Sequence, residues 1–110
     1  MPIDFEHLNQ YTAGDKSLEA EVLRLFAETA AAAQAVLDTT SSAEEWRRAA
    51  HKLKGSALAI GAWQLADLAA RAEMSGPAPP EGLQLLEAVR SEVAVVTAAI
   101  ASAPGCLADR

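Results

Sequence analysis

The chain has 110 residues, of which 51% are hydrophobic but only 5% aromatic, and its formal net charge is −6 at pH 7. This length accommodates one domain with a core and is too short for two. The acidic balance argues against nucleic acid and anionic membranes as main partners. Alanine, leucine, glutamate and arginine favour helices, so the composition predicts a single all-α domain over residues 1–110.

No segment of the sequence predicts export or a membrane span. The first residues lack the positive region followed by an apolar stretch that marks a signal peptide. No window reaches the roughly 18 uninterrupted apolar residues of a membrane helix. The single cysteine, Cys106, cannot form an intramolecular disulfide, which fits a reducing cytoplasm. We therefore expect a cytoplasmic protein, and the ending APGCLADR favours a free-standing one.

A short helix is predicted first, over 4–12, and a longer helix follows over 15–39. The break between them is AGD at 13–15, where Gly14 suits a helix C-terminus and Asp15 suits the next N-cap. The apolar residues of the longer helix follow helical spacing and predict its buried face. This face comprises Leu18, Val22, Leu25, Phe26, Ala33, Val36 and Leu37.

The third helix is predicted over 42–60, after the break DTTSS at 38–42. Ser42, followed three residues later by Glu45, makes a capping box, which is typical of a helix start. The predicted core face of this helix is formed by Trp46, Ala50, Leu53, Ala57 and Ile60.

The last two helices are predicted over 62–75 and 80–102, separated by the proline-rich break SGPAPPE at 75–81. Gly76 can end a helix, and Pro77 prevents its continuation. The apolar stripes of the two helices are Leu65, Leu68, Ala69 and Ala72 in the first, and Leu86, Val89, Val93, Val96 and Ile100 in the second.

Short connections make consecutive helices antiparallel, and the four apolar stripes have to bury one another. The sequence has no strand pattern and no internal repeat. The predicted fold is therefore all-α, an up-down antiparallel four-helix bundle with a short extra N-terminal helix. Residues 103–110 are expected to form a loose C-terminal tail, and the protein is expected to be a monomer.

The helix over 42–60 carries a histidine and a glycine on the side away from its core face. At about 100° per residue, His51 points roughly 140° from the middle of that face. Lys54 and Gly55 are its neighbours one turn on, and Leu58 lies at a similar angle two turns on. A mid-helix glycine costs about 1 kcal/mol relative to alanine, so close approach by another molecule would account for Gly55. A close contact with another helix of the chain is the alternative.

Basic side chains crowd around the histidine although the chain is acidic overall. They would favour a phosphoryl group and attract an acidic pocket. These residues are Arg47, Arg48, Lys52 and Lys54. A solvated histidine on a solvated charged face is the simpler interpretation, and it stays open at this point. The other histidine, His7, stands alone on the first helix and is expected to be a surface residue.

The stretch HKLKGSALAIG resembles the motif of the histidine phosphotransfer (HPt) domains of two-component phosphorelays. That motif is a histidine followed by x-L-K-G-S/A, a further glycine and spaced leucines. The matching residues are His51, Leu53, Lys54, Gly55, Ser56, Gly61, Leu65 and Leu68. The segments IDFEHLNQYTAGD and LEAEVLRLFAET also resemble the family, so the likeness spans nearly the whole chain. The bundle predicted above is the family's fold.

The resemblance implies that His51 accepts a phosphoryl group from the phospho-aspartate of one receiver domain and passes it to an aspartate of another. The phosphorylated atom would be Nε2, Lys54 would pair with the phosphoryl oxygens, and Gly55 would leave room for the receiver's active-site loops. Glu73 stands where the family commonly has a glutamine that orients the histidine. A carboxylate there would accept the Nδ1 proton and raise the basicity of the ring, with a solvated acid as the alternative.

The partners implied are receiver domains of response regulators and of a hybrid histidine kinase. The docking residues expected beside the histidine are Arg47, Arg48, Lys52 and Leu58. No cofactor is expected, since Mg²⁺ belongs to the receiver, and the sequence contains no metal-ligand cluster. No glycine-rich phosphate loop is present, so a carrier is expected rather than a kinase. Lys52 also stands where a kinase dimerisation domain normally has an acidic residue.

Two other functions remain open from the sequence. One is a helical docking module that is not phosphorylated and that binds or sequesters a receiver or kinase. The other is an enzyme in which His51 is a general base beside Glu73. The sequence supplies no nucleophile, oxyanion device or cleft for such an enzyme.

Overall fold

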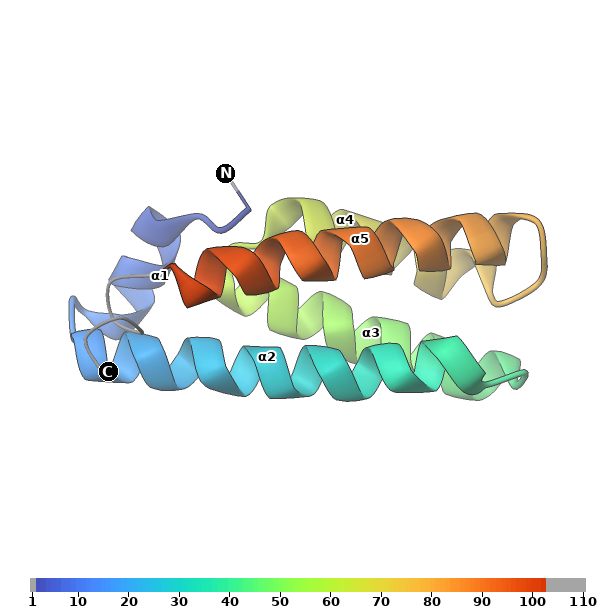
Figure 1. The fold of residues 1–110 in the computed structure, drawn as a ribbon, viewed down its shortest axis with the longest axis horizontal. Helices are drawn as coiled ribbons and strands as arrows, with labels where there is room; N and C mark the ends of the chain where they lie inside the picture. Colours follow the sequence, from blue (N-terminus) through green and yellow to red (C-terminus); the bar gives the residue numbers. More distant parts are fainter. Residues whose placement is uncertain (1, 103–110) are drawn as a thin grey trace.

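The computed structural model describes residues 2–102, whose regular structure consists of helices without any strand (Figure 1). The helices are α1 (Phe5–Thr12), α2 (Lys16–Thr39), α3 (Ala43–Ile60), α4 (Trp63–Ser75) and α5 (Glu81–Ala101). Each begins one residue after its predicted start, because the predicted first residue is the N-cap. None of these described helices is both long and apolar enough to cross a membrane. The tail expected at 103–110, with Cys106, lies outside the described residues.

The four long helices form a closed bundle in which each helix packs on two neighbours. In the view of Figure 1, α2 and α5 lie in front and contact each other, with α3 and α4 paired behind them. The bundle is completed by contacts of α2 with α3 and of α4 with α5. The short α1 lies across one end and contacts α2 and α3. The predicted all-α, up-down bundle with an extra N-terminal helix is thus confirmed.

One buried hydrogen bond sets the register between α3 and α4. The indole Nε1 of Trp46 donates to the carbonyl oxygen of Ala72 over 2.7 Å, and both residues are buried. An indole N–H buried without a partner is costly, so this bond favours one alignment of the two helices. Glu73 directly follows Ala72, so the same alignment places Glu73 beside the middle of α3. The predicted core face of α3 is buried throughout: Trp46, Ala50, Leu53, Ala57 and Ile60.

The predicted buried face of α2 was wrong in part. Three of its residues are exposed instead: Leu18, Leu25 and Val36. The residues of α2 that are buried are Glu19, Ala20, Leu23, Phe26, Ala30, Ala33 and Leu37. The helix carries two apolar series with the same three–four spacing, offset by one residue. Glu19 belongs to the buried series, where it is hydrogen-bonded to Lys16 over 3.3 Å. Because a charged residue is expected on the exposed face, Glu19 made the buried series look like the exposed one in the sequence.

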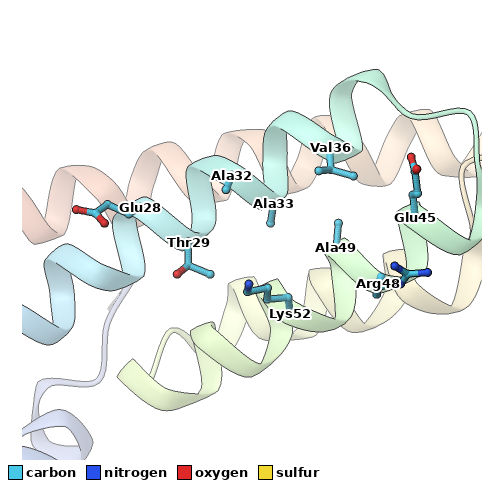
Figure 2. A pocket seen from close by; sticks show the side chains of 9 residues that line it. All are labelled: Glu28, Thr29, Ala32, Ala33, Val36, Glu45, Arg48, Ala49 and Lys52. Carbon is cyan, nitrogen blue, oxygen red and sulfur yellow. The ribbon is translucent and has the colours of Figure 1, made fainter.

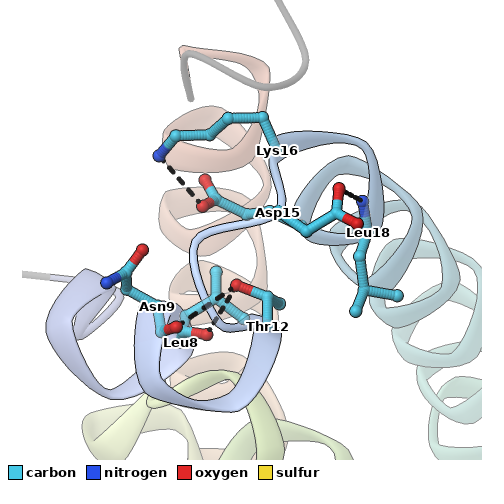
Figure 3. Close-up of polar contacts among 7 residues, drawn as sticks. Leu8, Asn9, Thr12, Asp15, Lys16 and Leu18 are labelled. Atoms are coloured by element: carbon cyan, nitrogen blue, oxygen red, sulfur yellow. Dashed lines mark hydrogen bonds and ion pairs between the residues drawn. The ribbon is translucent and has the colours of Figure 1, made fainter.

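The helix α1 is attached to the bundle through Asp4, the residue that caps its start. At its start, the Asp4 N–H donates to the carbonyl oxygen of Gly61 over 2.9 Å. The indole N–H of Trp63 donates to the Asp4 carboxylate over 3.1 Å. At its end, the Thr12 hydroxyl donates to the carbonyl oxygen of Leu8 over 3.1 Å within α1 itself, as Figure 3 shows. The two contacts of Asp4 fix the start of α1 against the corner between α3 and α4.

The position of His7 differs from the expectation of a surface residue. Its ring packs edge-on against Trp63, with ring centroids 4.9 Å apart, and the residue is half-buried. The contact was not predictable from the sequence because it joins residues on two different helices. His7 therefore helps to attach α1 to the start of α4.

The N-caps of α2 and α3 follow the predicted chemistry, with one difference. Asp15 accepts from the Leu18 N–H over 3.0 Å (Figure 3), and Ser42 accepts from the Glu45 N–H over 3.2 Å. The return bond of the capping box, from the Ser42 N–H to Glu45, is replaced by a relay. The Thr40 hydroxyl accepts from the Ser42 N–H over 3.0 Å and donates to the Glu45 carboxylate over 2.6 Å.

Candidate functional site

His51 lies in the middle of α3, on the side away from the core. Its side chain is 67% exposed, whereas Ala50 and Leu53, on the other side of the helix, are buried. Gly55 and Leu58, one and two turns further along the same side, are also exposed. Another molecule can therefore reach the imidazole together with a stretch of helix surface that has no side chain at Gly55.

The ring of His51 is held from α4 by Glu73. His51 Nδ1 lies 2.9 Å from Glu73 Oε2, and Lys54 Nζ lies 3.1 Å from Glu73 Oε1. One carboxylate thus bridges two side chains that lie one turn apart on α3. The alignment that the Trp46–Ala72 hydrogen bond favours brings Glu73 to this place.

The charge of Glu73 decides which ring nitrogen of His51 carries the proton. The Lys54 ammonium, hydrogen-bonded to the carboxylate, holds the pKa of Glu73 below its usual value of 4.5. Partial burial opposes this shift, and the hydrogen bond with His51 supports it. The carboxylate is therefore ionised at pH 7 and can only accept hydrogen bonds. In the neutral ring the proton is then on Nδ1 and the lone pair on Nε2, which no residue in the range 2–102 engages.

Gly55 is not a point of contact between helices. A Cβ atom built on Gly55 would meet no other atom within 4 Å. The alternative of a close helix–helix contact is therefore wrong. Nothing among the described residues accounts for the cost of about 1 kcal/mol that a glycine carries in a helix.

The basic residues that crowd around the ring in the sequence separate into groups in space. Lys54 turns to the α4 side, where Glu73 engages it. Arg48 and Lys52 turn to the α2 side and line a groove between α2 and α3. Arg47 is exposed. The expectation of one basic cluster around the ring is therefore corrected to two basic flanks, because successive side chains point in different directions around a helix.

The groove between α2 and α3 is open and has a volume of about 590 Å³ (Figure 2). Its lining residues are Glu28, Thr29, Ala32, Ala33, Val36, Glu45, Arg48, Ala49 and Lys52. In Figure 2, Ala33 and Val36 of α2 face Ala49 and Lys52 of α3 across the groove. The α2 wall is mainly apolar and also carries Glu28, and the α3 wall carries the two basic residues together with Glu45. Since Lys52 directly follows His51, the groove adjoins the face that carries the ring.

The pairing of Lys54 with Glu73 was missed by sequence reasoning, which assigned Lys54 to phosphoryl oxygens alone. A partial signal was present, since Lys54 follows His51 by one turn and lies on the same side of α3. Within residues 2–102, no group of histidine, cysteine, aspartate and glutamate side chains is arranged to hold a metal ion. The site that the described residues form brings together an oriented imidazole, a bridging carboxylate and an ammonium.

Together these features define a class of protein: an all-α bundle that presents one histidine on an open helix face, with one ring nitrogen engaged and the other available. A family model described as the Hpt domain matches residues 17–99, so the chain belongs to the Hpt domain family. No curated protein and no solved structure matches the chain. The resemblance seen in the sequence is confirmed, and the all-α bundle is the Hpt fold.

Membership of the family establishes the broad role of the chain. Hpt domains are phosphocarrier modules of two-component signalling rather than kinases. They interact with receiver domains in phosphorelays. The chain therefore has a phosphotransfer role in two-component signalling.

Proposed function

We propose that this protein is a histidine-containing carrier that relays a phosphoryl group between the aspartates of receiver domains through a phosphohistidine at His51. The observation that carries the proposal is the hydrogen bond between Nδ1 and Glu73, which leaves Nε2 available on a ring that is 67% exposed. A histidine that is merely solvated has no need of a charged partner on another helix.

The transfer consists of two displacements at one phosphorus atom. In the first, the Nε2 lone pair of His51 attacks the phosphorus of an aspartyl phosphate. The N–P bond forms as the bond from phosphorus to the aspartate oxygen breaks, and the aspartate leaves as a carboxylate with the electron pair. In the second, a carboxylate oxygen of another receiver attacks, and the electron pair of the N–P bond returns to Nε2. Mg²⁺ on the receiver neutralises charge on the phosphoryl oxygens.

Lys54 and Gly55 assist the approach of the receiver in this proposal. Gly55 leaves the surface one turn from the ring bare, so loops around the receiver's aspartate can come within reach of Nε2. Lys54 is half-buried and carries three N–H donors. Once the N–P bond has formed, Lys54 can turn from Glu73 to the phosphoryl oxygens, with which it forms charge-assisted hydrogen bonds.

The groove between α2 and α3 extends this docking face and fits an amphipathic helix of the receiver that has an acidic edge. Leu25 and Val36 belong to the exposed apolar series of α2 and offer contacts to an apolar helix face. Arg48 and Lys52 on the other wall attract acidic side chains. The exposed Leu58 adds an apolar contact on the histidine side.

Label transfer from phosphorylated receivers of the same organism tests the proposal. We expect the protein to acquire acid-labile, alkali-stable label, and we expect none on an equally folded His51→Gln variant. A panel of receivers would then identify the partners. If no receiver labels the protein although receivers bind it as well as they bind the variant, the proposal is wrong and the chain is a docking module.

Reversal of one charge tests the docking groove. Charges at the rim of an interface act mainly on the association rate, so Lys52→Glu should slow transfer at low receiver concentration by about tenfold, and less at high salt. Arg71→Glu reverses an exposed charge on α4 outside this groove and is the matched control. Equal effects of the two variants would show that overall charge, and not the groove, governs docking.

A further inference from the structure

The Glu73 carboxylate accepts from the one ring nitrogen that phosphorylation leaves untouched. We propose that Glu73 keeps the Nδ1 proton on His51 through the whole transfer cycle, so that the phosphorylated ring is a cation and a ready phosphoryl donor. This inference rests on the proposed function and adds the charge state of its intermediate. A neutral amide in place of Glu73 would accept the same hydrogen bond without favouring the charge.

Atoms and charges balance over the transfer cycle without any proton entering or leaving the ring. After the attack, the ring of His51 has phosphorus on Nε2, hydrogen on Nδ1 and one positive charge. When the N–P bond breaks, the electron pair returns to Nε2 and the ring is neutral, with the same hydrogen on Nδ1. Had the Nδ1 proton been lost in between, the leaving group would be an imidazolide anion, which departs much less readily. Retention of the proton therefore favours the second displacement.

The geometry around Glu73 suits this role. The 2.9 Å separation of Oε2 from His51 Nδ1 is typical of a charge-assisted hydrogen bond, which strengthens when the ring is a cation. Oε1 is held by Lys54 over 3.1 Å. In the unphosphorylated protein the carboxylate is shared by two partners. When Lys54 turns to the phosphoryl oxygens, the negative charge of Glu73 acts on the ring cation alone.

Among the described residues, Glu73 is the charged group hydrogen-bonded to the ring, and Lys54 is paired with the same carboxylate. Glu73 is the group from α4 that contacts the ring among the described residues, and α5 does not pack against α3. Toward α2, Glu28 lines the groove together with Glu45, Arg48 and Lys52. The remaining charged or titratable groups of the elements that pack on α3, and of α3 itself, are Glu6, His7 and Tyr11 on α1, Lys16, Glu19, Glu21, Arg24 and Asp38 on α2, Glu44, Glu45, Arg47, Arg48 and Lys52 on α3, and Asp67 and Arg71 on α4.

The pH dependence of phosphoryl loss tests the inference. The protein is loaded with phosphoramidate, a small donor that needs no receiver, and phosphohistidine is followed by phosphorus NMR. Glu73→Gln should keep its phosphoryl group about tenfold longer than the unmodified protein near pH 8, because its ring loses the Nδ1 proton more easily. Near pH 5 both rings are protonated, so the two lifetimes should converge. Asp67→Asn, which removes an exposed charge from the same helix, should match the unmodified protein at both pH values.

Three outcomes would overturn the inference. Lifetimes that differ by one factor at every pH would mean that Glu73 only positions the ring, and equal lifetimes would mean that its charge has no effect. Nitrogen NMR of the phosphorylated, unmodified protein near pH 8 needs no variant, and a bare Nδ1 there would also contradict the inference. Because loading uses a small donor, failure of receivers to label His51 would overturn the proposed function and leave this result unaffected.

Discussion

Gly55 and Gly61 lie on the same segment of chain, yet they are required for different reasons. Gly61 ends α3 with a φ of +78°, and a Cβ atom there would lie 2.8 Å from Asp4 Cβ and 3.0 Å from the Asp4 carbonyl oxygen. A Cβ atom on Gly55, which sits inside the helix, would meet nothing within 4 Å. The fold therefore requires Gly61, whereas no contact within residues 2–102 requires Gly55, and we attribute this glycine to the approach of another molecule.

Gly61→Ala should have the largest effect on stability. The substitution forces a side chain into the left-handed region and against the backbone of Asp4, which is hydrogen-bonded to the Gly61 carbonyl. Strain of these two kinds predicts a loss of about 2–4 kcal/mol in the free energy of unfolding. Urea unfolding followed by circular dichroism measures it. A loss well below about 1 kcal/mol would mean that the Asp4 segment moves aside freely and that the contrast with Gly55 is weak.

Gly55→Leu should slow transfer from a phosphorylated receiver by about tenfold or more, equivalent to about 1.4 kcal/mol of barrier. Leucine favours helices and the site is open, so the fold should be retained. Loading by phosphoramidate is the control and should proceed at the normal rate, because a small donor does not need the bare surface. A normal rate with the receiver would remove the explanation offered for this glycine.

The helix ends could be predicted to within one residue because they carry local signals, such as the capping side chains of Asp15 and Ser42. The buried face of α2 could not. Its exposed series contains Leu18 and Leu25, while its buried series contains Glu19, so hydropathy alone favours the wrong face. Packing of α2 against α3 and α5 decides between the two series, and that is a property of the whole bundle.

Only those features of the candidate site that depend on a single helix could be predicted from the sequence. The outward direction of His51 follows from the helical angle, but the position of Glu73 was taken from the family resemblance, since no local rule relates residues on two helices. The pairing of Lys54 with Glu73 was not anticipated. It depends on the register of α3 against α4, to which the Trp46 hydrogen bond contributes from the core.

Gly55→Ala separates helix propensity from the approach of a partner. Alanine is favoured over glycine in an exposed helix interior, so the free energy of unfolding should rise by about 0.5–1 kcal/mol. Transfer from a receiver should slow less than in Gly55→Leu, because a methyl group covers little surface. The same urea experiment measures the first effect. A loss of stability would show that the fold needs this glycine too, and the contrast with Gly61 would disappear.

The smallest effect is expected from Asp4→Asn, which removes the charge of the residue that crowds Gly61. Asparagine can still cap α1 and accept from the Trp63 indole. The backbone N–H of His7, followed by the Trp63 indole, holds the pKa of Asp4 below its usual value of 3.8. The ionised form therefore stabilises the fold above pH 3.8, and this contribution is lost as the pH falls through the lowered pKa.

Asp4→Asn should accordingly unfold at a lower urea concentration than the unmodified protein at neutral pH, and the two midpoints should approach each other as the pH falls through the lowered pKa of Asp4. Convergence of the two midpoints in acid would show that the charge of Asp4, and not only the geometry of its hydrogen bonds, supports the contact that makes Gly61 necessary. If the difference persisted unchanged in acid, Asp4 would act through the shape of its hydrogen bonds alone. The corner between α1 and α3 would then depend on backbone fit without any contribution from the carboxylate charge.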